Sequence, residues 1–199
     1  MALTSRKKRP IDRQSKPVPH RDARLFIIAT EGSKTEKQYF SMFGNKRCQV
    51  RVITNEDNKS APAYILKQLK KFKNDYQLKG DDELWLMVDV DRWGNKHLAS
   101  VASQAEHSKF KLAVSNPCFE VWLYLHYDNL KEQVITAGDM KKKLQIILDG
   151  YNSSKLDTSK FVEHIDEAII RAKKLDVNQD ERWPSSIGTH VYKIVEKVK

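Results

Sequence analysis

The segment LWLMV (residues 84–88), followed by DVD (residues 89–91), decides both the expected fold class and the position of a candidate site. A short apolar run of this kind is typical of a strand that is buried on both faces, as in parallel sheets. Asp89 and Asp91 then stand at its carboxyl end, where they can point to one side and share a divalent cation; without a cation they would repel each other. The alternative is a solvated turn in which one aspartate caps the next helix.

On either side of this segment, short apolar runs alternate with amphipathic stretches. We predict strands at 25–30, 49–54 and 111–115, and helices at 33–43, 62–75, 96–107 and 118–127. Ser33 and Glu36 have the spacing of a capping box, and Asn116 and Pro117 suit the N-cap and first position of the last of these helices. Strands that alternate with helices predict an α/β fold with a mostly parallel sheet flanked by helices.

The pattern changes after residue 127. Amphipathic helices are predicted at 139–148 and 160–174 with a polar loop between them, and Pro184 leads into a final helix at 188–198. We interpret this part as a helical insertion or appendage. The predicted divisions are a basic N-terminal arm (1–24), an α/β core (25–127) and a helical insertion whose C-terminal helix completes the domain (128–199).

Much of the net charge of +10 lies in the N-terminal arm. Residues 1–24 contain eight basic and two acidic side chains, a net charge of +6, which leaves +4 for the rest of the chain. A basic, proline-containing tail without apolar periodicity is expected to be disordered when free, and such an arm can follow a phosphate backbone. The alternative is a solubilising leader with no specific partner.

Several classes of protein are disfavoured by the sequence. No apolar run approaches the roughly 18–20 residues needed to cross a membrane, and the N-terminus has no signal-peptide pattern. Cys48 and Cys118 are expected to be buried free thiols, so we expect a cytoplasmic protein. There is no GxxxxGKS or GxxxxGKT loop, no GxGxxG, no GxSxG and no HExxH, and the histidines lack zinc-like spacing. His126 is predicted to be a packed histidine.

Two further acids follow predicted strands. Glu31 comes directly after the first strand and outside the capping box, and Gly32 permits close approach of a phosphate. Glu120 lies in the first turn of a helix that is apolar almost all round, so its carboxylate needs a cation or several donors, or the positive end of its own helix. Because the carboxyl ends of parallel strands meet at one edge of a sheet, Glu31, Asp89 and Glu120 are expected to form one site.

Three motifs carry a resemblance to a known family. They are Glu31-Gly32 with Thr35-Glu36 and Tyr39; Asp89-x-Asp91; and Ser115-Asn116-Pro117-Cys118-Phe119-Glu120 with Trp122 and Leu123-x-Leu125-His126. Together they resemble the Toprim signature as it occurs in RloB-like proteins, which include the AbiLii component of phage abortive infection. The resemblance runs from about Leu25 to the C-terminus. The basic arm departs from it, and the looser C-terminal motif assigns no role to Ser186, Thr189 or His190.

The resemblance implies a Toprim-like fold in which Glu31 is the catalytic acid and Asp89 and Asp91 hold Mg²⁺, with Mn²⁺ as an alternative ion. Glu120 is a further candidate ligand. Such a site would hydrolyse phosphodiester bonds in RNA or DNA. Glu31 would either bind the ion or take a proton from the attacking water.

The sequence also offers candidate residues for phosphate contact, and the resemblance implies a partner protein. Gly32, Lys34 and Arg92 are candidate phosphate contacts, although both long side chains can equally be solvated. Relatives of the RloB-like type lie beside a separate ATPase of the ABC/AAA type, which implies the effector of a two-component bacterial anti-phage system. The rival hypothesis is a non-catalytic nucleic-acid-binding module or a regulatory subunit of that ATPase. A homodimer remains open.

Overall fold

The structure is a computed structural model, and it describes residues 22–32, 34–54, 62–76, 78–91, 93, 95–132 and 134–199. Most of the predicted N-terminal arm, together with Ser33 of the predicted capping box and Arg92, therefore lies outside the described residues.

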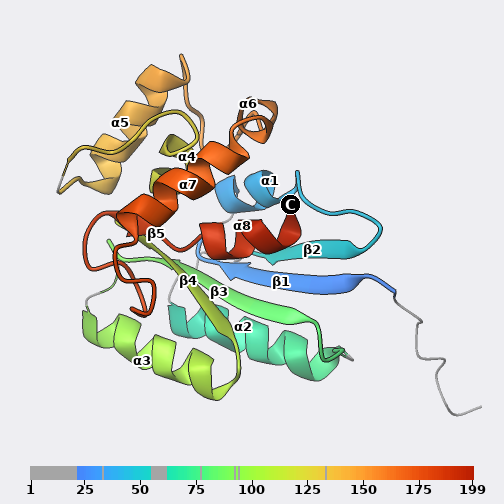
Figure 1. Ribbon diagram of the computed structural model, residues 1–199. Helices are drawn as coiled ribbons and strands as arrows, with labels where there is room; N and C mark the ends of the chain where they lie inside the picture. Colours follow the sequence, from blue (N-terminus) through green and yellow to red (C-terminus); the bar gives the residue numbers. More distant parts are fainter. Residues whose placement is uncertain are drawn as a thin grey trace, which may run out of the picture.

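A five-stranded sheet forms the centre of the molecule (Figure 1), with the strand order β2-β1-β3-β4-β5. The strands are β1 (Arg24–Thr30), β2 (Cys48–Ile53), β3 (Glu83–Asp89), β4 (Lys111–Asn116) and β5 (Gly188–Thr189). β1, β2, β3 and β4 are parallel, and only the short β5 pairs antiparallel, with β4. This confirms the predicted α/β fold with a mostly parallel sheet; β5 was not predicted, because its residues were assigned to the final helix.

The two faces of the sheet are packed by different helices, as the period of two along each strand requires. Ile27 and Leu86 face the side covered by α2 (Pro62–Asp75) and α3 (Asn95–His107). Phe26 and Trp85 face the other side, which is covered by the remaining helices (Figure 1). Those helices are α1 (Thr35–Phe40), α4 (Glu120–Tyr124), α5 (Ala137–Ile147), α6 (Ser159–Val162), α7 (Ile165–Leu175) and α8 (Tyr192–Val198).

The predicted start of the helix after β4 is wrong. Asn116 is the last residue of β4, its peptide bond to Pro117 is cis, and α4 begins only at Glu120. The Asn116 side chain instead donates a hydrogen bond to the carbonyl oxygen of Pro184 at 3.0 Å. The helix itself is shorter than predicted and has Phe119 as its N-cap.

Other helix boundaries also differ from the prediction. α1 has Lys34 as N-cap without a side-chain cap bond, and it ends at Phe40 rather than residue 43. The stretch predicted as one helix at 160–174 is divided into α6 and α7, with Glu163 and His164 between them. The first difference is at helix ends and the second is a break within a predicted helix, and neither changes the layer arrangement.

Several smaller predictions are confirmed. Cys48 and Cys118 are buried free thiols, and His126 is fully buried. Its Nε2 lies 3.0 Å from the Tyr39 hydroxyl and its Nδ1 lies 3.0 Å from the carbonyl oxygen of Trp122, so it is a packed, hydrogen-bonded histidine. Within the described residues, none of the helices combines the length and apolar character needed to span a membrane.

Candidate active site

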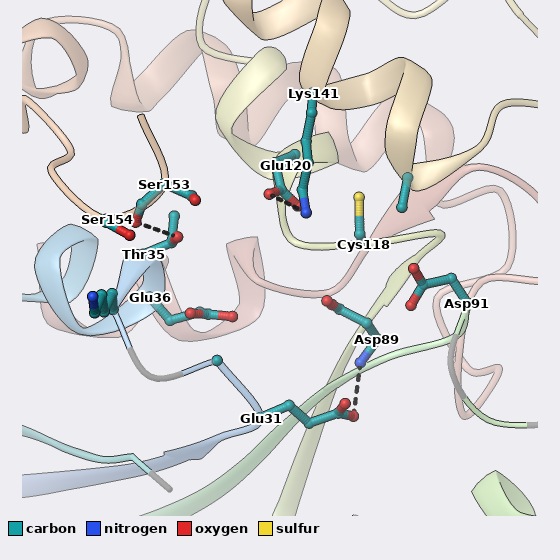
Figure 2. Close-up of a pocket in the computed structure, with 13 residues that line it drawn as sticks. Glu31, Thr35, Glu36, Asp89, Asp91, Cys118, Glu120, Lys141, Ser153 and Ser154 are labelled. Carbon is teal, nitrogen blue, oxygen red and sulfur yellow. Dashed lines mark hydrogen bonds and ion pairs between the residues drawn. The ribbon is translucent and has the colours of Figure 1, made fainter. Parts of the chain in front are cut away.

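A pocket of about 320 Å³ lies where the parallel strands end (Figure 2). Its lining consists of Glu31, Gly32, Lys34, Thr35, Glu36, Asp89, Asp91, Cys118, Glu120, Ala137, Lys141, Ser153 and Ser154. Glu31 follows β1, Asp89 ends β3 and Glu120 opens α4, so the strand ends bring together acids that are distant along the chain. Six of the seven predicted site residues are in this lining, and the seventh, Arg92, lies outside the described residues.

Glu31 is held in place by two donors. The Trp93 indole Nε1 donates to both carboxylate oxygens of Glu31, at 2.9 and 2.8 Å, and the backbone N–H of Asp89 donates to Oε1 at 3.3 Å. The side chain is buried, with 8% of the residue exposed. Glu31 therefore has a fixed orientation next to the end of β3. Trp93 was not predicted to take part in the site; its signal was its place just after the aspartate pair.

Asp89 lies among the other acids of the pocket. Burial raises the pKa of this carboxyl well above its ordinary value, and the negative charges of Glu36, Glu31, Glu120 and Asp91 raise the pKa further. An ionised Asp89 is thus unfavourable in the pocket unless a positive charge is added. A bound cation would supply that charge.

Glu120 is buried on the opposite wall of the pocket from Glu31 (Figure 2). Its Oε1 accepts a hydrogen bond from the Tyr151 hydroxyl at 3.2 Å, and the ammonium of Lys141 lies 3.7 Å from the same oxygen. The buried carboxylate is thus satisfied at least in part by a donor and a cation from the C-terminal helical region. The neighbouring Cys118 is a protonated thiol, because burial and the charges of Glu120 and Asp89 raise its pKa.

Glu36 is a pocket residue that the sequence interpretation missed. It was assigned to a capping box, but its carboxylate is buried and lines the acidic pocket. A Cβ added at Gly32 would lie only 2.0 Å from Glu36 Oε2, so a larger residue at this position would displace the flexible end of the Glu36 side chain. The signal was present in the sequence: Glu36, Tyr39 and Phe40 have the i, i+3, i+4 spacing of one helix face, and all three are buried.

The carboxylates of the pocket are the type of ligand that a hard divalent cation binds, but their present positions do not form a coordination site. Carboxylate oxygens are the ligands that Mg²⁺ prefers, and Mg²⁺ usually keeps several waters beside one or two of them. As the side chains stand, however, no three His, Cys, Asp or Glu residues in the described part of the chain are arranged to hold a metal ion. Binding would therefore require the carboxylates to move toward one another.

Fold and pocket together define an α/β protein with an acidic site at the carboxyl edge of a mostly parallel sheet. The chain belongs to the RloB-like protein family, whose family model matches residues 26–198, from β1 to α8. The predicted membership of the RloB-like family is thereby confirmed. No curated protein and no solved structure gives a significant match.

Proposed function

We propose that this chain is a Toprim-type nuclease that hydrolyses phosphodiester bonds in RNA or DNA with the help of Mg²⁺, for which Mn²⁺ can substitute. The observation that carries the proposal is the gathering of five carboxylates, distant along the chain except for the Asp89–Asp91 pair, around one pocket, with the pKa of Asp89 raised by burial and then by the charges of the other four. Repulsion among these carboxylates destabilises the protein when no cation is bound. A bound divalent cation offsets that repulsion with its two positive charges.

Asp89, Asp91 and Glu120 are the residues that would hold the ion, because they offer carboxylate oxygens to the same pocket. A bound Mg²⁺ would neutralise charge on the scissile phosphate and lower the pKa of a coordinated water. Glu31, oriented by Trp93 and the Asp89 amide, either joins the ligands or accepts a proton from the attacking water.

Lys34 and Gly32 lie at the pocket and remain the proposed phosphate contacts, with Arg92 outside the described residues. Lys34 is exposed, as expected of a residue that meets a large substrate. The basic residues of the arm would add sequence-independent contacts to the nucleic-acid backbone.

The proposal extends to the cellular setting implied by the resemblance. A separate ATPase of the ABC/AAA type would hydrolyse ATP, in agreement with the lack of a nucleotide-binding loop in this sequence. The pair would form an abortive-infection system against phage, with this chain as effector.

A non-catalytic nucleic-acid-binding or regulatory subunit is the second candidate function. It is favoured by one observation, that the acids of the described residues are not arranged as a ready-made ligand set. This candidate predicts nucleic-acid binding, or altered ATP turnover by the partner, that survives removal of the acids.

Cleavage of labelled tRNA and of plasmid DNA with Mg²⁺ tests the proposal. We expect cleavage by the wild type and its loss in Glu31→Gln and Asp89→Asn, while Asp180→Asn, an exposed acid outside the pocket lining, keeps it. Mg²⁺ should also raise the melting temperature of the wild type but not of Asp89→Asn. Equal cleavage by all four proteins would contradict the proposal, and binding without cleavage in all four would favour the second candidate.

A further inference from the structure

One wall of the acidic pocket comes from the C-terminal helical region rather than from the sheet. Lys141 of α5 and the loop residues Ser153 and Ser154 face the strand ends across the pocket (Figure 2). The loop is fixed to α1: the Thr35 hydroxyl donates to the carbonyl oxygen of Ser153 at 2.8 Å, and the backbone N–H of Leu156 donates to a Gln38 side chain at 2.8 Å. The helical region therefore contributes residues to the lining of the site.

Lys141 differs from the two lysines that follow it in α5. Lys142 pairs with Asp139 at 3.1 Å, and Lys143 pairs with Glu132 at 2.5 Å, both outside the pocket lining. Lys141 lines the pocket, and its ammonium lies 3.7 Å from Glu120 Oε1. That distance is too long for a hydrogen bond, and half of the side chain is exposed (51%), so the ammonium is attracted to Glu120 without being locked to it.

The charge balance of the pocket gives Lys141 a second partner. The lining contains five carboxylates and two lysines, a formal charge of −3, which a divalent cation would reduce only to −1. A substrate phosphate entering such a pocket still meets a net negative charge. It needs a cation from the protein close to where it binds.

We propose that Lys141, in addition to Lys34, contacts the substrate phosphate, and that it pairs with Glu120 only until a divalent cation takes its place. This inference rests on the proposed function. An ammonium and a divalent ion compete for the same carboxylate, so binding of the ion would free Lys141, whose long flexible stem allows its ammonium to meet a phosphate in the pocket.

Tyr151 makes this exchange feasible. Its hydroxyl donates to the same Glu120 oxygen that Lys141 approaches, so Glu120 keeps one protein partner after the lysine has moved. Burial and the nearby charge of Glu120 raise the pKa of Tyr151, which keeps the hydroxyl protonated as a donor. Tyr151 is thus a positioning residue for Glu120.

Two titrations of the full chain test the inference: Mn²⁺ alone, and a fluorescent single-stranded RNA or DNA with Ca²⁺ in place of Mg²⁺. Lys141→Met should bind Mn²⁺ about threefold tighter or more, because a competing positive charge is gone. It should bind the labelled strand about fivefold weaker or more, because a phosphate contact is lost. Lys141→Arg should restore strand binding, and Lys142→Met is the matched control with both affinities unchanged.

The opposite signs of the two effects separate this role from a structural one, since a damaged pocket would weaken both. If Lys141→Met and Lys142→Met behave alike in both titrations while Asp89→Asn loses Mn²⁺, the inference about Lys141 is wrong and the proposed function stands. If the wild type itself binds no Mn²⁺, the proposed function fails, and the inference fails with it.

Discussion

Trp93 fixes the carboxylate of Glu31 by donating to both of its oxygens. Trp93→Phe keeps an apolar ring and removes the donor. Removing such orienting partners typically costs about 10–100-fold in metal affinity or activity, so we expect a loss of that size in kcat/KM for strand cleavage. Trp183→Phe is the control, because Trp183 packs against the core on the α2 and α3 face of the sheet. Unchanged kcat/KM in Trp93→Phe would show that the indole has no part in the site.

His126 gives the fold a defined pH dependence. Burial lowers its pKa from 6.5 to about 4, so the folded protein holds it neutral, between Tyr39 and the Trp122 carbonyl. Because this pKa is depressed in the folded state, the associated stability is complete above about pH 6.5 and decreases as the pH falls toward 4. The loss is on the order of 3 kcal/mol.

Urea unfolding at a series of pH values measures this dependence. His126→Phe should flatten the stability profile between pH 6.5 and 4, whatever its effect on stability at pH 8. His97→Gln, at an exposed histidine, should leave the profile as it is. A profile for His126→Phe that falls as steeply as the wild type would show that another group titrates.

Some residues of the candidate site could be predicted from the sequence and others could not. Asp89 and Glu31 follow apolar strands, and their meeting follows from the rule that parallel strands end at one edge. Two patterns in the sequence make opposite predictions for Glu36. A capping box turns its side chain back to the helix start, whereas the i, i+3, i+4 pattern places it on the buried helix face, where the structure has it. The roles of Trp93 and Tyr151 could not be predicted, because their partners Glu31 and Glu120 are distant along the chain.

At the scale of elements, β4 and β5 are joined by a buried pair of hydroxyls. Ser115 Oγ and Thr189 Oγ1 lie 2.9 Å apart, and Thr189 Oγ1 also accepts from the backbone N–H of Val191 at 3.2 Å. Thr189→Val leaves these groups without their partner, and each unsatisfied buried group costs about 1–3 kcal/mol. For a chain of this size, 1 kcal/mol corresponds to about 2–4 °C in Tm.

A double-mutant cycle measures the coupling between the two strands. Ser115→Ala combined with Thr189→Val should destabilise less than the sum of the single changes, by about 0.5–3 kcal/mol, because both members of the pair are then absent. Additive effects on the free energy of unfolding would show that the hydroxyls do not interact. Because Ser115 pairs in register with Asp89, the cycle measures the stability of the sheet next to the candidate site.

Element type was predictable here, whereas element ends were not. The apolar runs and the 3.6-residue periodicity gave β1 to β4 and the two-turn or longer helices α2, α3, α5 and α7. The two-residue β5 has no periodicity to detect, and its pairing depends on the Thr189 contact with a strand more than seventy positions earlier. The helix start that the local sequence favours at Asn116 is likewise absent, because Asn116 ends β4 and pairs there with Gly188 of β5.

At the scale of the whole molecule, charge is divided between an acidic pocket and a basic arm. Residues 1–21 contain seven basic side chains and one acidic one. Replacing the seven with glutamine removes most of the chain's net positive charge. We expect weaker binding to single-stranded nucleic acid and a shallower dependence of log Kd on log salt, since each phosphate contact contributes about 0.7 to that slope. Fluorescence anisotropy at several salt concentrations measures both. An unchanged slope would assign nucleic-acid contact to residues after 21 alone.

The helical region predicted at residues 128–199 contributes side chains to the pocket at the edge of the sheet. Sequence periodicity marked residues after 127 as a separate helical region, and the family match continues through them to residue 198. Lys141 and Tyr151 from that region contact Glu120 at the edge of the sheet. Such contacts could not be inferred from the sequence, because nothing local to α5 indicates which of its three consecutive lysines meets the pocket.

The central claim is that the acids at the carboxyl edge of the sheet hold one divalent cation. Anomalous diffraction from crystals of the full chain soaked in Mn²⁺ tests it most directly. The account predicts a peak between Asp89, Asp91 and Glu120, within about 2.2 Å of at least two of their carboxylate oxygens, and its loss in Asp89→Asn. A fully soaked crystal with no peak in this pocket, or an equal peak in Asp89→Asn, would contradict it.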